Sequence, residues 1–527
     1  MYAATLADED TRESAPLVMK QQVTQLQSSL NSAASFIAPE LLKIPKSKID
    51  KFMAGEPGLS DYRQFIDDTM RKKAHTLDEA GERLVAEAGL MSEVQEGVHR
   101  ILSEADLPYP TITLSDGKEV KVNTSNYTLY RESPNRADRK ATMAAFFTAL
   151  KSYERTFGVS LYGEIRKNLF YRNARNHKTC LESALFRDNI PVGVYTSLVK
   201  NINDSLPTLH RYLKLKREML GLDDLRYYDL YAQMVKEAKS SYTFAQSKKL
   251  IVEATSCLGK EYTAVMEKAF GGRWIDVYPT AGKLSGAYMA GDAYDVHPYV
   301  LTNFNDTFDS VSTLAHELGH AAHSYFSNKH QPYVNSRYPI FLAEVASTVN
   351  EALLVDHVLE CVGDNAEKIS LLGGYLEQFR TTLFRQTQFA EYELGIHQAA
   401  EKGEAFTGDG FTAAYLELLK KYYGHAKDIC TIDDLYGIEW AYIPHFYMNF
   451  YVFQYSTSFT ASQAIAAKIL DGDRSTIEKH LGFLKSGSSE YPIPTLKKVG
   501  IDMERPEPFR LALRRMNSIM DRIEALR

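Results

Sequence analysis

The chain has 527 residues and a net charge of −6, with 44% hydrophobic and 24% charged residues. These values are typical of a globular protein and exclude a disordered chain, a collagen-like fibre and a coiled-coil rod. The charge also argues against nucleic acid as a partner, because nucleic-acid-binding proteins usually carry a strong basic excess. Single cores rarely grow beyond about 250–300 residues, so the length predicts two or more lobes.

The cysteine content and the N-terminal sequence indicate the cellular compartment in which the protein works. The four cysteines lie far apart and form no CxxC pair, which excludes a zinc ribbon and a thioredoxin-like redox site. The N-terminus is acidic and lacks the apolar region of a secretory signal. No run of about 18 apolar residues occurs, so we expect no spanning helix and no membrane partner. A cytoplasmic location is therefore predicted.

Most of the chain shows the apolar spacing of amphipathic helices, without internal repeats. We expect helices over Leu17–Ile37, Ser60–Ala88, Asp138–Thr156, Val194–Leu220, Phe244–Lys268, Asp364–Glu401, Phe411–Tyr423, Ser475–Lys485 and Pro508–Leu526. The predicted fold class is therefore mainly α.

The helical pattern stops between residues 271 and 305, where five glycines alternate with β-forming segments. This pattern predicts a small sheet containing a hairpin. We place a lobe boundary near residue 270, with a helical N-terminal lobe (1–270) and a catalytic lobe (271–527). Gly286, Ala287 and Tyr288 form a candidate edge strand that could pair with an extended peptide. A plain structural hairpin explains them equally well.

The strongest chemical signal is the HExxH motif His316-Glu317-Leu318-Gly319-His320. On a helix, residues i and i+4 share a face, so both imidazoles can bind one metal ion, typically zinc. Glu317 lies about 100° around the helix from His316, beside the metal, where it can take a proton from a metal-activated water. The apolar flanks predict a buried helix, and Gly319 suggests a close approach of another segment.

A catalytic zinc ion needs a third protein ligand. His323 lies only one turn beyond the motif and is interpreted as a core or second-shell histidine. Phe326 stands where a metzincin would have its third histidine, which excludes that class. Glu344 and Glu351 lie seven residues apart within FLAEVASTVNEALL, so they share one apolar helical face.

We assign Glu344 as the third ligand and Glu351 as an acceptor that orients a ligating imidazole. Two ordinary surface glutamates remain the alternative. Asp309, two turns before His316, is a second candidate for an orienting role.

Peptide hydrolysis also needs donors for the developing oxyanion. The segment IPHFYMNFYVFQYSTSF offers His445 and three tyrosines spaced by four residues, Tyr447, Tyr451 and Tyr455, which a helix would present on one face. An aromatic core stripe is the alternative. We favour His445 and Tyr455 as transition-state donors, and Tyr447 and Tyr451 as contacts with the substrate.

Taken together, DSVSTLAHELGHAAHSYF, FLAEVASTVNEALL and IPHFYMNFYVFQYSTSF resemble the oligoendopeptidase F branch of the M3 metallopeptidases. Similarity also covers the strand region, the helical lobe and the C-terminal segment FLKSGSSEYPIPTLKKVGIDMERPEPF, and so nearly the whole chain.

The resemblance implies a two-lobed, clam-like helical fold around a deep channel, with one zinc ion on the channel floor and short unstructured peptides as substrates. It matches His316, His320 and Glu344 to the zinc ligands and Glu317 to the general base. It also matches His445 and a downstream tyrosine to the oxyanion-side donors. The chain departs from the family pattern at Phe453, where relatives often have tyrosine. It also starts later than typical members, which suggests a shorter N-terminal cap.

We therefore expect a zinc oligoendopeptidase. One rival is a zinc exopeptidase, such as a carboxypeptidase or dipeptidase, which needs a cation for a terminal carboxylate; Arg337, Lys283 and Arg380 are candidates. A peptide-binding protein without catalysis is the other rival, although such a protein has no need for Glu317.

Overall fold

A computed structural model describes residues 1–235 and 241–527, and it divides the chain into two compact units. Unit 1 comprises Met1–Thr76, Lys239–Gly363 and Ser458–Asp502. Unit 2 comprises Leu77–Ala238, Asp364–Thr457 and Met503–Arg527. This division differs from a single boundary near residue 270, because each unit combines segments that are far apart in the sequence.

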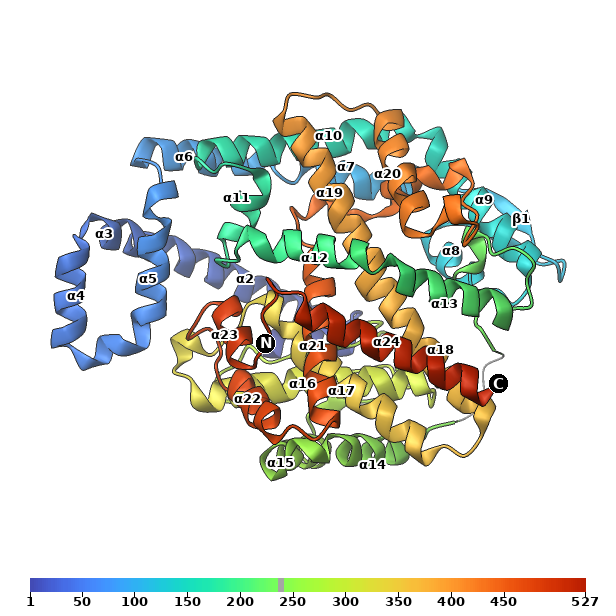
Figure 1. The fold of residues 1–527 in the computed structure, drawn as a ribbon. Helices are drawn as coiled ribbons and strands as arrows, with labels where there is room; N and C mark the ends of the chain where they lie inside the picture. Colours follow the sequence, from blue (N-terminus) through green and yellow to red (C-terminus); the bar gives the residue numbers. More distant parts are fainter. Residues whose placement is uncertain (236–240) are drawn as a thin grey trace. The chain divides into compact units, whose positions relative to one another are not determined.

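Both units are mainly helical, as the sequence predicts (Figure 1). The helices of unit 1 are α1 (Tyr2–Glu9), α2 (Ser14–Ala34), α3 (Ile37–Lys43), α4 (Lys46–Gly55), α5 (Arg63–Lys72), α14 (Phe244–Thr255), α15 (Lys260–Gly271), α16 (Phe308–His330), α17 (Ile340–Cys361), α22 (Arg474–Leu484) and α23 (Pro492–Lys498). Helix α21 (Phe453–Leu470) begins in unit 2 and continues into unit 1.

Unit 2 contains a second set of helices. They are α6 (Glu79–Ala88), α7 (Val94–Ile101), α8 (Thr124–Tyr130), α9 (Arg136–Ser152), α10 (Glu154–Ala174), α11 (Cys180–Phe186), α12 (Val192–Asp204), α13 (Leu206–Met219), α18 (Asn365–Gln378), α19 (Gln386–Glu401), α20 (Gly408–Tyr422) and α24 (Glu507–Leu526). A π-helix, η8 (Phe379–Arg385), joins α18 to α19.

Two long predicted helices are each interrupted by a residue with special backbone properties. The stretch 194–220 divides into α12 and α13 at Pro207, which lies in the first turn of α13. Proline has no N–H to donate and therefore starts a helix more readily than it continues one. The stretch 244–268 breaks at Gly259, whose φ of 96° is accessible to glycine at little cost.

The small sheet expected between residues 271 and 305 is present in unit 1. It contains β3 (Ile275–Asp276), β4 (Tyr288–Ala290) and β5 (Tyr299–Leu301) in the order β3-β5-β4, so β4 lies at an edge. Strand β5 runs parallel to β3 and antiparallel to β4. A separate hairpin in unit 2, β1 (Thr111–Thr113) and β2 (Glu119–Lys121), was not predicted from the sequence.

Helix α16 occupies the interior of unit 1. It packs against α15, α17, α22 and β4, while α14 covers the neighbouring α17. Figure 1 shows α16 and α17 side by side, above α14 and α15. Among the described residues, no helix has both the length and the apolar character that a membrane crossing demands.

Candidate metal centre

The HExxH motif lies in the middle of α16, which begins after the N-cap residue Thr307 and crosses α17 at Gly319. A Cβ atom on Gly319 would lie 2.6 Å from the Cα of Ser347 and 2.8 Å from the carbonyl oxygen of Ala346. The close approach suggested by this glycine is therefore confirmed, and it is what allows the two helix backbones to meet.

Asn350 fixes the register between the two helices. Its side-chain amide donates a hydrogen bond of 3.1 Å to the carbonyl oxygen of Ala315, one residue before the motif. The hydroxyl of Tyr262, from α15, donates to Asn350 Oδ1 at 2.7 Å. Asn350 is fully buried, so these bonds are shielded from water and hold the motif helix in place.

Three possible metal ligands converge at this crossing. His316 Nε2 lies 3.2 Å from Glu344 Oε2, His320 Nε2 lies 3.5 Å from the same oxygen, and the two imidazole nitrogens are 3.2 Å apart. Ligands about 2.0–2.1 Å from a tetrahedral zinc ion are separated by about 3.3 Å. The measured spacings fit that geometry, and two imidazoles with one carboxylate form a typical donor set of catalytic zinc.

Glu351 accepts a hydrogen bond from His316 Nδ1. This bond would keep a proton on Nδ1 when a metal ion is bound, and so leave Nε2, which faces Glu344, to act as the ligand atom. Burial would lower the pKa of His316, but hydrogen bonds with Glu344 and Glu351 outweigh it and raise the pKa. Glu351 thus occupies the position expected of a residue that orients a ligating imidazole.

The carboxylate of Glu344 is held by two kinds of donor. Burial acts to raise its pKa, but hydrogen bonds with His316 and His320 hold the pKa well below its usual range. The hydroxyl of Ser347, which is fully buried, donates a further bond of 3.0 Å to Glu344 Oε2. The carboxylate therefore stays ionised and oriented, as a metal ligand requires.

Glu317 is only 7% exposed, although it carries a carboxyl group. Burial raises its pKa, while the neighbouring imidazoles of His316 and His320 act in the opposite direction. A carboxyl whose pKa is raised towards neutrality can both accept and return a proton, which suits a general base that later acts as an acid.

Two sequence candidates lie away from this group. His323 is 1% exposed and stacks on Tyr338 with a ring separation of 3.6 Å, so it is a core histidine. Burial lowers its pKa well below the usual value. Asp309 is exposed in the first turn of α16, where a carboxylate stabilises the N-terminus of a helix.

The glycine-rich candidate strand coincides with β4 and the two residues before it. Gly286 has a φ of 84°, and its carbonyl oxygen accepts a hydrogen bond from the side chain of Asn303. Tyr288 donates its hydroxyl proton to Asp8 of α1 at 3.0 Å, so this hydroxyl has a structural partner. The main chain of β4 is the part of this segment that remains suited to peptide pairing.

In unit 2, three of the four candidates around Ile443–Phe459 form a cluster. The Tyr455 hydroxyl lies 3.4 Å from His445 Nε2, and Tyr451 stacks parallel to His445 while meeting Tyr455 edge-to-face. Tyr447 is only 6% exposed and packs on His99 with a ring separation of 4.7 Å. Burial lowers the pKa of His445, which favours the neutral imidazole.

The three tyrosines do not share one helix. The 3₁₀ helix η11 (Pro444–Tyr447) ends at Tyr447, and α21 begins only at Phe453. Between them, Asn449 and Phe450 adopt φ values of 46° and 59°, which turn the chain sharply. The spacing of four residues therefore does not correspond to a helical face.

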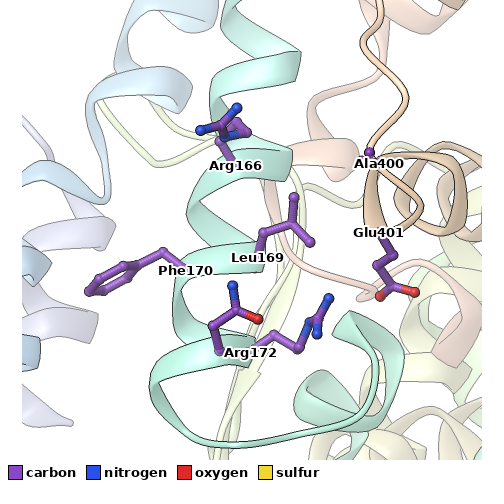
Figure 2. A pocket seen from close by; sticks show the side chains of 8 residues that line it. Arg166, Leu169, Phe170, Arg172, Ala400 and Glu401 are labelled. Carbon is purple, nitrogen blue, oxygen red and sulfur yellow. The ribbon is translucent and has the colours of Figure 1, made fainter.

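A surface hollow of about 350 Å³ lies elsewhere in unit 2, between α10 and the end of α19. Figure 2 shows Arg166, Leu169, Arg172 and Glu401 around it. Its lining contains none of the candidate site residues, so it is separate from the groups described above.

Sequence inspection missed Ser347, Asn350 and Tyr262. Ser347 lies three residues after Glu344 and could have been found from that helical spacing. Asn350 and Tyr262 carry no such signal, because their partners lie 35 and 88 residues away.

Comparison with known proteins places these residues in a wider context. A family model described as Peptidase family M3 matches residues 129–515, and one described as Oligopeptidase F matches residues 40–109. Oligopeptidase PepF of Bacillus subtilis (strain 168) is 39% identical over 525 residues, covering 100% of this chain and 78% of that protein. Group B oligopeptidase PepB of Streptococcus agalactiae is 36% identical, covering 98% of this chain and 85% of the relative.

Solved structures give the same picture. Oligoendopeptidase-F from Enterococcus faecium is 32% identical, with a TM-score of 0.78 and coverage of 100% of this chain and 89% of that one. A solved structure from Chlamydophila abortus reaches a TM-score of 0.93 at 36% identity, covering 100% of this chain and 87% of the other.

Proposed function

Because the chain belongs to peptidase family M3 and is a metallopeptidase, we propose that it is a zinc-dependent oligoendopeptidase that hydrolyses internal bonds of short, unstructured peptides. The observation that carries this proposal is the tetrahedral spacing of His316, His320 and Glu344 beside the buried carboxyl of Glu317. A protein that only binds peptides would have no use for that carboxyl.

His316, His320 and Glu344 would hold the zinc ion, with Glu351 fixing the proton on His316 Nδ1. Zinc, when bound, polarises the scissile carbonyl and makes a water molecule more acidic. Glu317 would take a proton from the attacking water as the water oxygen bonds to the carbonyl carbon. It would then pass this proton to the amine nitrogen as the C–N bond breaks.

His445 and Tyr455 are proposed as donors to the developing oxyanion. Their side chains lie within 3.4 Å of each other, and the pair matches the donors that the family resemblance implies. A neutral imidazole and a phenol can both donate hydrogen bonds without bringing a charge that must be desolvated. Tyr451, in ring contact with both, is proposed to contact the substrate. For Tyr447, burial against His99 favours a packing role over the substrate contact that the sequence suggests.

The substrate is proposed to bind as an extended strand. Support comes from β4, which pairs with β5 on one side only within the described chain and also packs on the motif helix. Main-chain pairing at such an edge requires an extended peptide, which a folded protein does not present. Gly286 and Ala287 directly precede this strand; glycine has no side chain and alanine only a methyl group, which would leave room for the peptide backbone.

The exopeptidase alternative is less well supported. Such an enzyme needs a fixed cation that can receive a terminal carboxylate. Arg380 is completely buried and paired with Glu377, and Lys283 is paired with Asp276. Arg337 is largely exposed, and its ion pair with Asp292 is long, at 4.0 Å. Such a side chain is not fixed in the way that recognition of a terminal carboxylate requires.

The experiment that tests the proposal is the substitution Glu317→Gln. We expect zinc content to stay at one ion per chain while kcat falls about 10²–10⁴-fold, because the variant lacks the group that moves the proton. Glu360→Gln, at an exposed position on α17, is the matched control and should retain full activity. Substantial turnover by Glu317→Gln would refute the assigned mechanism.

Cleavage of an internally quenched peptide blocked at both ends separates endopeptidase from exopeptidase activity. We expect internal cuts, located by mass spectrometry of the products. Cleavage that requires a free terminus would support the exopeptidase instead.

A further inference from the structure

The turn between η11 and α21 is strained. Asn449 and Phe450 both adopt the left-handed conformation, which is uncommon for residues other than glycine and costs of order 1–3 kcal/mol each. Phe450 is the more unusual of the two, because asparagine tolerates this conformation better than a bulky residue does. Such a turn persists only when its surroundings hold it.

Glu393 of α19 provides a contact that holds the turn. The backbone N–H of Phe450 donates a hydrogen bond of 2.6 Å to Glu393 Oε1. Glu393 is completely buried, and among the residues that the structure describes, Phe450 supplies the one hydrogen bond to its carboxyl group. Burying a carboxyl is unfavourable, so its presence at this point indicates a specific task.

The ring of Phe450 is anchored beside this hydrogen bond. It contacts Tyr195 of α12 and His397 of α19, with ring separations of 5.8 Å and 4.6 Å. The His397 ring is itself fixed, because its Nδ1 lies 2.8 Å from the carbonyl oxygen of Glu393 and its Nε2 lies 3.2 Å from the Asn168 amide. Both the backbone and the side chain of Phe450 are therefore held by buried partners.

Burial also determines the protonation of this anchor. It raises the pKa of Glu393 to about 8, and the carboxyl of Glu164 on α10 acts in the same direction. It lowers the pKa of His397 to about 4. The hydrogen bond from the Phe450 N–H acts against the rise in the pKa of Glu393. Burial nevertheless favours the uncharged form of both groups, so an amide in place of the Glu393 carboxyl changes the local charge little.

The held turn connects the two proposed oxyanion donors. His445 lies on η11 before it, and Tyr455 lies in the first turn of α21 after it. We propose that Glu393 is a positioning residue that fixes the turn at Phe450 and thereby keeps His445 and Tyr455 aligned for hydrogen bonding to the substrate. This inference rests on the proposed roles of His445 and Tyr455, and nothing in it requires Glu393 to touch the substrate.

The test compares Glu393→Leu with Glu393→Gln in the full-length zinc-loaded enzyme. Leucine removes the acceptor for the Phe450 N–H, so we expect kcat to fall about 10–100-fold, as misplaced catalytic groups typically cause, with KM changed much less. Glutamine keeps an oxygen acceptor of the same reach and should retain at least half of the wild-type kcat. Metal analysis and thermal unfolding confirm that both variants are loaded and folded.

A double-mutant cycle with Tyr455→Phe distinguishes positioning from general loosening. If Glu393 acts through the donor pair, Glu393→Leu should reduce kcat by less than threefold once the Tyr455 hydroxyl is absent. If Glu393→Leu and Tyr455→Phe instead lowered kcat by independent factors that multiply in the double mutant, the inference would be overturned. A loss of activity in Glu393→Gln as large as that in Glu393→Leu would also overturn it. Should Glu393→Leu fail to fold, activity of Glu393→Gln below a tenth of wild type would still refute it.

Glu391→Leu is the matched control on the same helix, since Glu391 bonds to Asn203, Lys421 and Tyr422 and lies outside the turn. It should lower the melting temperature but leave kcat within twofold; a loss like that of Glu393→Leu would overturn the inference. Failure of the proposed function is recognised separately, because Tyr455→Phe would then leave kcat unchanged by itself.

Discussion

Gly319 of α16 and Ser347 of α17 approach so closely that a single added methyl group would fall 2.6 Å from the Cα of the serine. Real Cβ atoms do not approach other atoms so closely, and here the neighbouring atoms belong to the backbone. Gly319 lies between His316 and His320 on α16, and Ser347 lies three residues after Glu344 on α17. Helix packing and ligand geometry therefore depend on the same contact.

Gly319→Ala is expected to separate the two helices and to destabilise the protein by about 1–3 kcal/mol, as overpacking usually does. Zinc affinity should fall as well, because the proposed ligands come from both helices. Thermal unfolding and metal analysis measure these effects. Gly482→Ala is the control, since nothing lies within 4 Å of the added Cβ inside α22. That variant should be as stable as the wild type or more stable by up to about 1 kcal/mol.

Removing the proposed third ligand should release the metal. In Glu344→Ala, only two imidazoles remain to bind zinc, so we expect occupancy after dialysis to fall sharply and activity to fall with it. Glu360→Ala, exposed near the end of the same helix, should keep full occupancy. Unchanged zinc content in Glu344→Ala would show that another residue completes the site.

Glu351→Gln should have a milder effect than loss of a ligand. The amide can no longer hold the Nδ1 proton of His316 as firmly, and residues in this position typically change metal affinity about 10–100-fold. Competition with a chelator of known affinity measures the change. An affinity equal to that of the wild type would mean that Glu351 does not orient the imidazole.

Acidic conditions should destabilise the fold through buried histidines. Burial lowers the pKa of His480 to about 4, against a usual value near 6.5. Between these two values the unfolded chain binds a proton that the folded state excludes, so stability is lost as pH falls from about 6.5 to 4. The full effect is on the order of 3 kcal/mol.

His480→Leu removes this group, so its melting temperature should fall less than that of the wild type between pH 7.5 and 5. His323 is also buried, and burial is the main cause of its lowered pKa, with His480 adding to it. The variant therefore keeps most of the loss of stability that His323 causes. Parallel decreases in the two proteins would contradict the assignment.

The parts of the site that follow a short helical period could be predicted from sequence. The spacing of His316 and His320, and the apolar face shared by Glu344 and Glu351, follow directly from 3.6 residues per turn. The same argument failed for Tyr447, Tyr451 and Tyr455, because two left-handed residues interrupt the helix between them. The spacing of apolar residues does not reveal a turn of this kind, and no glycine stands at Asn449 or Phe450 to signal the left-handed conformation.

Long-range organisation was also beyond the sequence pattern. Glu393 and Phe450 are 57 residues apart, and no spacing rule connects them. The alternation of sequence segments between the two units likewise depends on which apolar faces pack together in the fold, and no local spacing rule specifies it. The glycines and β-forming segments that begin near residue 270 indicate a change of secondary structure more reliably than a boundary between compact units.

The alternation of segments between the units has a practical and evolutionary consequence. The metal site is proposed to use His316, His320, Glu344 and Glu351, with Glu317 as the general base, and all five lie on α16 and α17, inside one uninterrupted stretch of unit 1. His445, Tyr455 and Glu393 are encoded in the following stretch, which belongs to unit 2. A single exchange near residue 363 would nevertheless replace parts of both units, because Ser458–Asp502 of unit 1 lies downstream of that point. No single truncation would yield either unit intact.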